Sequence, residues 1–159
     1  MIRSLHHVAI VCDDLERMLD FYCGVMGFER VASMSWDQGT EVVDQIIGTD
    51  NSAAEIAILK AGNAFLELFQ FTAPEGKPND PKNSSADRGV RHAAFDVSDI
   101  DAEYERLVAA GIVFNCPPVL IEVEGRPLKA AYFRDPEGNI MEIQELLDES
   151  SPLKLPDVR

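Results

Sequence analysis

The chain has 159 residues, a length that fits one compact domain with a sizeable core or two small halves that share one. Its 46% hydrophobic and 26% charged residues are ordinary for a globular protein, and no apolar run approaches the roughly 18–20 residues of a membrane span. Its net charge of −14 opposes non-specific binding to nucleic acid, whose phosphate backbone attracts basic patches.

The first half of the chain begins with a strand and a helix. Residues 5–12 are β-branched and apolar, which predicts a strand, and Asp13 or Asp14 supplies an N-cap for the helix that follows. Gly27 ends that helix. Strands are expected at 28–35, 54–59 and 64–71, and an insertion at 36–50 holds a short helical turn at 42–47.

A linker and a second half follow. Residues 72–89 are rich in Pro, Asn, Asp and Ser, which is typical of an irregular connection. A strand is then expected at 90–97, a cap at Ser98 or Asp99, a helix at 100–110 and a stop at Gly111. Further strands are expected at 112–115, 119–123, 127–133 and 139–146, and the polar tail from residue 148 is expected to be an extended or frayed arm.

The two halves repeat the same phrase. His7 stands seven residues before Asp14, and His92 stands seven residues before Asp99. Each copy closes on a strand with one glutamate, Glu67 in the first and Glu142 in the second. Internal repeats fix the architecture of a chain. The repeat predicts two βαβββ modules, at residues 1–71 and 90–147, joined by the linker 72–89 and followed by the tail 148–159. The sheets of the two modules are expected to curl round one shared cavity.

The copies differ in length. The distance from Gly27 to Glu67 is nine residues longer than the distance from Gly111 to Glu142, and residues 36–48 are the natural place for the excess. An insertion at the rim of a cavity is often a lid or a specificity loop.

The repeated glutamates occupy costly positions. Strand alternation puts Glu67 on the face of Phe65 and Phe69, and Glu142 on the face of Ile140 and Gln144. An ionised carboxylate among apolar residues needs a charge or a metal beside it. Two imidazoles and two carboxylates suit a divalent first-row metal and leave positions open for water or substrate, as in catalytic sites.

Two alternatives stay open for this set. The histidines can be ordinary residues at the edge of a core, with the glutamates paired to arginines. His6 can replace His7 as the ligand or orient it from behind, but alternation puts His6 on the opposite face and the second copy has Arg91 at its place. The repeat therefore favours His7.

These segments resemble a known family. Residues 5–27, 64–71 and 90–111, together with the run from Arg134 through Asp135-Pro136-Glu137-Gly138-Asn139 to Glu142, are similar to the vicinal oxygen chelate superfamily. That superfamily includes glyoxalase I, methylmalonyl-CoA epimerase, extradiol dioxygenases and fosfomycin-resistance proteins. The resemblance covers nearly the whole chain apart from the linker and the tail.

The resemblance implies an α+β fold, in which two tandem βαβββ modules form a curled, incompletely closed eight-stranded barrel around a metal site. The family's ligands fall on His7, Glu67, His92 and Glu142, which would hold one divalent ion: Ni, Zn, Co, Mn or Fe. This ligand set looks like that of bacterial glyoxalase I, whereas the linker and the lengths of the halves look more like the epimerase. The implied enzyme is a metal-dependent lyase, isomerase or epimerase that stabilises an enediolate of a small oxygen-chelating substrate. Glu142 or Glu67 would move the proton.

The sequence also leaves rival functions open and gives expectations for the partners and the location of the protein. The rivals are an Fe(II)-dependent dioxygenase of the same superfamily and a non-catalytic protein that binds a small molecule. We expect a small-molecule substrate, no nucleic-acid or membrane partner and, by resemblance, a homodimer whose site lies within one chain or across two. Because the first residues lack the apolar core of a signal peptide, a cytoplasmic location is expected.

Overall fold

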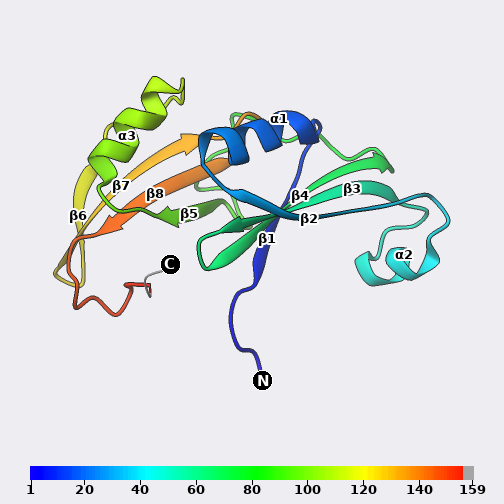
Figure 1. Ribbon diagram of the computed structural model, residues 1–159, viewed down its shortest axis with the longest axis horizontal. Helices are drawn as coiled ribbons and strands as arrows, with labels where there is room; N and C mark the ends of the chain where they lie inside the picture. Colours follow the sequence, from blue (N-terminus) through cyan, green and yellow to red (C-terminus); the bar gives the residue numbers. More distant parts are fainter. Residues whose placement is uncertain (156–159) are drawn as a thin grey trace. The chain divides into compact units, whose positions relative to one another are not determined.

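The computed structural model describes residues 1–155, and the chain divides into two compact units, Met1–Asn79 and Asp80–Arg159. Each unit contains one four-stranded mixed sheet, so the fold is α+β (Figure 1). Neither of the two sheets closes on itself over the described part of the chain. Among residues 1–155, no helix is long and apolar enough to cross a membrane.

In the first unit, the sheet has the strand order β1-β4-β3-β2. β1 pairs with β4 in parallel, and the other neighbours are antiparallel. The elements in chain order are β1 (His7–Val11), α1 (Leu15–Leu19), η1 (Asp20–Val25), β2 (Glu29–Trp36), α2 (Glu41–Ile47), β3 (Ala53–Ala61) and β4 (Ala64–Ala73).

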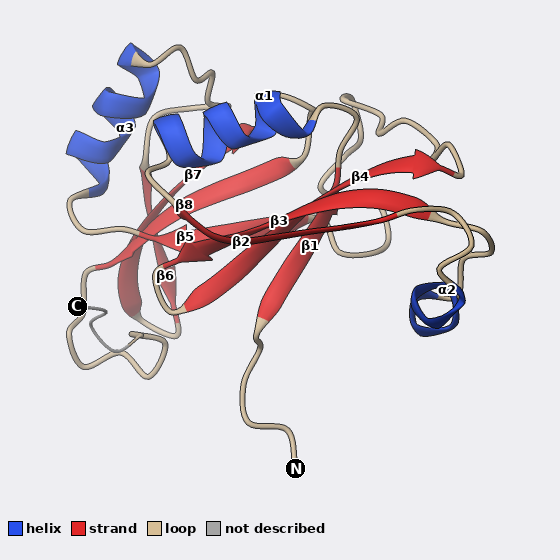
Figure 2. Ribbon diagram, turned by 45° about the vertical axis from the view of Figure 1, so that its right-hand side comes forward, coloured by secondary structure: helices blue, strands red, loops and turns tan. Residues whose placement is uncertain are grey.

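The core of the first unit lies between α1 and one face of its sheet (Figure 2). Asp14 begins α1, because its side chain accepts a hydrogen bond from the backbone N–H of Arg17. Met18 and Tyr22 recur at helical spacing and are fully buried. The predicted helix is continuous to residue 25, but its second half, η1, is a π-helix.

The opposite face of this sheet carries a smaller apolar cluster. Trp36 on β2 packs with Ala54 and Ile56 on β3, and Phe69 and Phe71 on β4 join them. α2 connects β2 to β3, as the sequence predicted for residues 42–47, and lies beyond the ends of these strands (Figure 2). α2 contributes Val43 to the cluster, and the cluster's members on the strands lie on the face that carries Glu67.

In the second unit, the strand order β5-β8-β7-β6 has the same form as that of the first. β5 is parallel to β8, and β8, β7 and β6 are antiparallel. The elements are β5 (His92–Asp96), α3 (Ile100–Ala109), β6 (Val119–Val123), β7 (Arg126–Arg134) and β8 (Ile140–Leu146).

α3 packs against β8 through one apolar side. Ile100 and Leu107 of α3 are fully buried, as is Ile143 of β8. Asp99 begins the helix, because its side chain accepts a hydrogen bond from the backbone N–H of Ala102. This cap was one of the two that the sequence predicted.

Two sequence expectations for the second unit are wrong. Residues 112–115 do not form a strand: Phe114 makes one isolated bridge to Phe133, and the prolines at 117 and 118 follow closely. The tail is not a frayed arm over residues 148–155, because two successive turns fold it back. Residues 156–159 of the expected tail lie outside the described residues.

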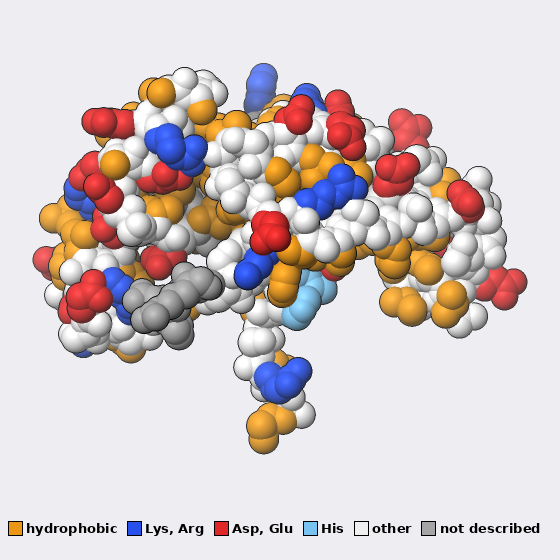
Figure 3. All heavy atoms as spheres, viewed as in Figure 1, with side chains coloured by type: hydrophobic (Ala, Val, Ile, Leu, Met, Phe, Trp, Pro, Cys, Tyr) orange, Lys and Arg blue, Asp and Glu red, His pale blue; other side chains and the backbone are white. Residues whose placement is uncertain are grey.

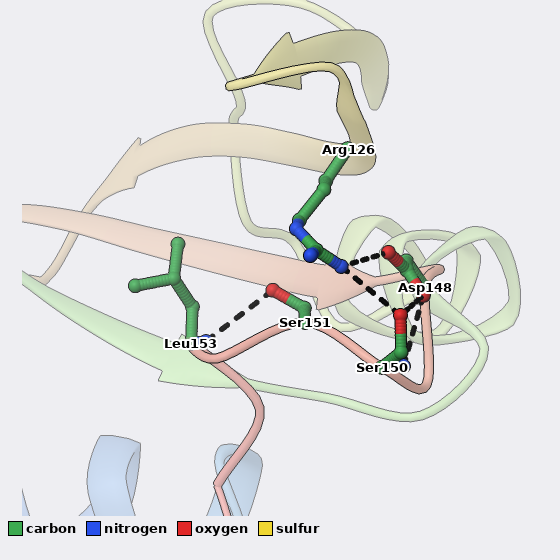
Figure 4. Close-up of polar contacts among 5 residues, drawn as sticks. All are labelled: Arg126, Asp148, Ser150, Ser151 and Leu153. Atoms are coloured by element: carbon green, nitrogen blue, oxygen red, sulfur yellow. Dashed lines mark hydrogen bonds and ion pairs between the residues drawn. The ribbon is translucent and has the colours of Figure 1, made fainter.

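One arginine holds this tail. Arg126 at the start of β7 forms an ion pair with Asp148 at 2.5 Å and donates a hydrogen bond to Ser150 at 3.0 Å (Figure 4). The next turn contains a hydrogen bond from the backbone N–H of Leu153 to the Ser151 hydroxyl, and Ser151 is buried. The sequence analysis assigned Arg126 no part in holding the tail, and the structure identifies it as an anchor.

Candidate functional site

The first half-site is a histidine–glutamate pair on β1 and β4. In the parallel ladder, His7 is the partner of Phe65 and Ala9 is the partner of Glu67, so the glutamate lies two residues beyond the position opposite the histidine. Their side chains lie on the same face. His7 Nε2 is 3.3 Å from Glu67 Oε2, and the side chains are 41% and 17% exposed.

The second half-site has the same construction. His92 on β5 is the partner of Ile140, and Ala94 is the partner of Glu142, which again places the glutamate two residues beyond the histidine. His92 Nε2 is 3.2 Å from Glu142 Oε2, and the side chains are 40% and 10% exposed. The sequence repeat thus corresponds to one strand register that occurs twice. In both units the glutamate carboxylate contacts the histidine of its own repeat.

The two repeats also share a helix cap that the sequence analysis missed. The side chain three residues after each glutamate reaches the start of the helix on the other face of its sheet. Gln70 accepts a hydrogen bond from the backbone N–H of Leu15 at 2.9 Å, and Glu145 accepts one from that of Ile100 at 3.0 Å. The sequence did hold a signal for this cap, because Gln70 follows Glu67 at the same spacing as Glu145 follows Glu142.

His6 contacts His7 directly. The Nδ1 atoms of the two rings are 3.0 Å apart, and the His6 ring stacks on Phe65 with centroids 4.9 Å apart. The expected orientation on the opposite face is wrong, because β1 begins only at His7 and His6 precedes the alternating residues. His6 therefore lies beside the Nδ1 atom of His7, while the Nε2 atom of His7 faces Glu67. This contact is compatible with the second of the two roles that the sequence left open, in which His6 lies behind His7.

Tyr132 completes the second half-site, and the sequence analysis missed it. It lies directly opposite Glu142 in the β7–β8 ladder. Its ring is edge-on to His92, with centroids 5.3 Å apart. Burial, the hydrogen bond to Glu142 and the charge of that carboxylate raise the pKa of Tyr132 to about 12, so the phenol stays protonated and donates. The signal was the pair of strands expected at 127–133 and 139–146, because a short connection between them makes a hairpin that brings the residues near 132 and 142 together.

The insertion of the first half is fixed by Asp44 of α2. Its carboxylate accepts hydrogen bonds from the Ser52 hydroxyl at 2.5 Å and from the backbone N–H groups of Ser52 and Asn51. The bonds from Ser52 lower the pKa of Asp44. Trp36 Nε1 donates to the same Ser52 hydroxyl at 2.9 Å, which links α2 to the apolar cluster on the face that carries Glu67. We call these hydrogen bonds among Asp44, Asn51, Ser52 and Trp36 the Asp44 latch.

The outer side of α2 is apolar. Val42 and Ile46, four residues apart, are 62% and 78% exposed, and several orange side chains are visible in the region of this helix in Figure 3. None of the residues of α2 is buried. The insertion that the sequence indicated as a lid or specificity loop is therefore a short helix held mainly by polar contacts.

The donors of each half-site fit a first-row cation. Metal–nitrogen and metal–oxygen bonds of about 2.1 Å at roughly a right angle put two donor atoms about 3 Å apart. The separations of 3.3 Å and 3.2 Å are close to that value. Within residues 1–155, neither unit by itself gathers three or more His, Cys, Asp or Glu side chains that could hold a metal. Each unit supplies one histidine–glutamate pair.

Comparisons with known proteins identify the family of this chain. A model of the Glyoxalase/Bleomycin resistance protein/Dioxygenase superfamily matches residues 4–143. A 2-epi-5-epi-valiolone epimerase from an Actinomyces species is 31% identical over 147 residues, which are 90% of this chain and 79% of that protein. The mitochondrial methylmalonyl-CoA epimerase of Dictyostelium discoideum is 23% identical over 145 residues, 91% of this chain and 79% of that protein.

Solved structures show the same fold. A glyoxalase family protein from Bacillus cereus superposes with a TM-score of 0.77 at 21% identity, covering 93% of this chain and 97% of that one. The match over residues 4–143 confirms the resemblance that the repeated motifs indicated. The chain belongs to the Glyoxalase/Bleomycin resistance protein/Dioxygenase superfamily.

Proposed function

We propose that the protein is a divalent-metal-dependent epimerase or isomerase of the glyoxalase I-like type, which acts on a small substrate with two adjacent oxygens. The observation that carries this proposal is the doubled histidine–glutamate pair, built twice with the same register and nearly the same distance. A single pair of this kind is a common ion pair. Its repetition at the same strand positions is what a shared ligand set requires.

In this proposal His7, Glu67, His92 and Glu142 hold one ion of Ni, Zn, Co, Mn or Fe, around which the two sheets form an incompletely closed barrel. Two carboxylates balance the charge of a divalent cation, and the imidazoles are neutral ligands. The cation, when bound, supplies positive charge for the two substrate oxygens on which negative charge develops.

The chain's own residues have distinct parts in the proposed reaction. His7 and His92 bind through Nε2, the atom that faces the glutamate in each half-site. One of the two carboxylates accepts a proton from the substrate carbon beside the carbonyl and returns it, which changes the configuration or the position of the carbonyl group. The aromatic cluster of Trp36, Phe69 and Phe71 lies on the face that carries Glu67, where an apolar surface limits the access of water.

The relatives favour proton transfer within the superfamily, because two of them are named as epimerases. The ligand set points the same way. Fe(II)-dependent oxygenases typically use two histidines and one carboxylate, whereas this chain offers two carboxylates. A protein that only binds a small molecule has no need of either metal-type pair.

Hydrogen exchange into the substrate tests the proposal. The protein, loaded with Ni²⁺ or Co²⁺, is incubated in D₂O with methylmalonyl-CoA, 2-epi-5-epi-valiolone, or methylglyoxal and glutathione. NMR then follows deuterium at the carbon beside the carbonyl. We expect metal-dependent incorporation or isomerisation of one compound class and its loss in Glu142→Ala. Oxygen consumption with Fe(II) and an aromatic diol would contradict this function and favour the dioxygenase. Full affinity for a small ligand without any metal would favour the non-catalytic binding protein.

A further inference from the structure

The outer edge of the second unit's sheet is apolar and exposed. β6 is the last strand in the order β5-β8-β7-β6, and within residues 1–155 only β7 pairs with it (Figure 1). All five residues of β6 are exposed, and four of the five are apolar: Val119, Leu120, Ile121 and Val123. A strand that is apolar on both faces is typical of the interior of a sheet, where other elements cover it.

The backbone of β6 has donors and acceptors for one further strand. In an antiparallel ladder, alternate residues direct their N–H and C=O groups to opposite sides of the strand, and β7 uses only one side of β6. No bulge interrupts this ladder, because each residue from Val119 to Val123 has one partner in β7. A regular, apolar edge is a template for pairing with another strand.

The equivalent edge of the first unit is protected. β2 takes the same last place in the order β1-β4-β3-β2. It begins with the charged residues Glu29 and Arg30, and its register with β3 shifts between Arg30 and Ala32. Ser33 and Ser35 add hydroxyls to the rest of the strand. Charges and irregular register are the means by which proteins block pairing at an edge, and β6 has few of them.

The charge around β6 favours a second copy of the chain as its partner. With a net charge of −14, two copies repel each other in general. The hairpin of β6 and β7, residues 119–134, is an exception, because it carries two glutamates and three basic residues and so has a net charge of +1. Two copies can therefore approach each other at this hairpin without the repulsion of their acidic surfaces.

The sequence of β6 is also complementary to itself. In an antiparallel pair about a twofold axis at Ile121, this residue faces Ile121 of the other copy, and Val119 faces Val123. These pairs form one row of β-branched side chains, which pack well across neighbouring strands. On the other face Leu120 lies opposite Glu122, so no two like charges face each other.

We propose that β6 is an interface between two copies of this chain, which join their second-unit sheets through an antiparallel β6–β6 pair. One five-residue strand per copy buries less than the roughly 1,200 Å² of a stable interface, so the dimer is weak and reversible. Five strand spacings of about 4.8 Å separate the two copies of β8, which puts their Glu142 residues about 24 Å apart. The interface therefore does not join the half-sites of two copies, and it is independent of the proposed function.

Sedimentation velocity over about 1–200 µM protein tests the association. The wild type should show a reversible equilibrium of monomer and dimer. Ile121→Lys, which places two ammonium groups across the axis, should weaken the association at least about 10-fold. Val31→Lys is the matched control, because Val31 lies on the protected edge strand β2 and is 44% exposed, against 46% for Ile121. This control should associate like the wild type, and both variants should keep its urea midpoint.

Crosslinking tests the register in a second, independent way. Cys116 is the exposed native cysteine, so the variants are made in a Cys116→Ser background. Ile121→Cys should form a disulfide-linked dimer on mild oxidation, because directly opposed residues of an antiparallel pair lie within the range of a disulfide. Val31→Cys in the same background should stay without a crosslink.

The outcomes decide the proposal. A wild-type protein that stays monomeric over the whole range overturns it. A dimer that Ile121→Lys does not weaken also overturns it, because its interface then lies elsewhere on the chain. If Ile121→Lys lowers the urea midpoint, the crosslinking result decides, and equal crosslinking of Ile121→Cys and Val31→Cys contradicts the interface.

Discussion

Glu142 and Glu145 lie three residues apart on β8 and point to opposite faces of its sheet. Glu142 approaches His92 on one face, at 3.2 Å, and Glu145 accepts hydrogen bonds from the first backbone N–H groups of α3 on the other. Two residues separated by an odd number of positions along a strand point to opposite faces of its sheet. One strand thus carries a proposed metal ligand and a structural cap, and substitutions can separate the two roles.

Alanine at the two glutamates should therefore have different effects. Glu142→Ala is expected to abolish activity and weaken the retention of Co²⁺ or Ni²⁺ while the metal-free domain stays folded. Glu145→Ala is expected to lower the free energy of unfolding by about 1 kcal/mol, because it removes the two hydrogen bonds that Glu145 accepts at the start of α3, and to leave metal affinity unchanged. Urea denaturation and metal titration of both variants measure the two effects. If Glu142→Ala loses its fold and a refolded sample keeps wild-type turnover, its assignment as a ligand is wrong.

The Asp44 latch is expected to depend on pH. The pKa of Asp44 is lowered by its hydrogen bonds from Ser52, so the latch contributes stability above the unfolded pKa of about 3.9 and loses it as the pH falls through the lower folded value. Trp36 is the one tryptophan of the sequence, and its indole donates to Ser52. Its emission should therefore shift in acid, before the far-ultraviolet circular dichroism changes.

Two variants control the latch measurement. Asp44→Ala should show the shifted emission already at neutral pH. Ser52→Ala should move the acid transition to higher pH, because Asp44 then loses the hydroxyl hydrogen bond that is the largest cause of its lowered pKa. An emission change that always coincides with global unfolding would show that the latch does not open separately.

Gly138 should be sensitive to substitution. It has a φ of +83°, and an added Cβ would lie 2.7 Å from the Cα of Pro81 in the linker. Gly138→Ala is expected to lower the free energy of unfolding by about 2 kcal/mol or more, from backbone strain together with the displaced linker. Gly24→Ala is the control, since its φ is not positive and an added Cβ would meet nothing within 4 Å. Equal urea midpoints for the two variants would contradict this account.

The two histidine–glutamate pairs could be predicted from the sequence because each of their residues lies on a strand inside a repeat. His7, Glu67, His92 and Glu142 follow from two copies of one pattern, and the parallel registers bring each pair together. The strand expected at 112–115 could not be excluded in advance, because a short apolar run has the same composition whether or not a partner strand is free to pair with it.

Contacts that depend on register or on the tail were harder to predict. Tyr132 is one of several aromatic residues on strands, and only the pairing of β7 with β8 distinguishes it. Arg126 looked like any surface cation, because its partners Asp148 and Ser150 lie in a segment with no periodic pattern. The π-helix at η1 also leaves no mark in the spacing of its apolar residues.

A crystal structure of the Co²⁺-loaded protein, with anomalous diffraction recorded at the cobalt edge, tests the central claim most directly. The account predicts a single cobalt peak per site, about 2.1 Å from Nε2 of His7 and His92 and from carboxylate oxygens of Glu67 and Glu142, whether one chain or two supply them. Separate peaks at the two pairs, or cobalt bound away from all four side chains, would contradict it.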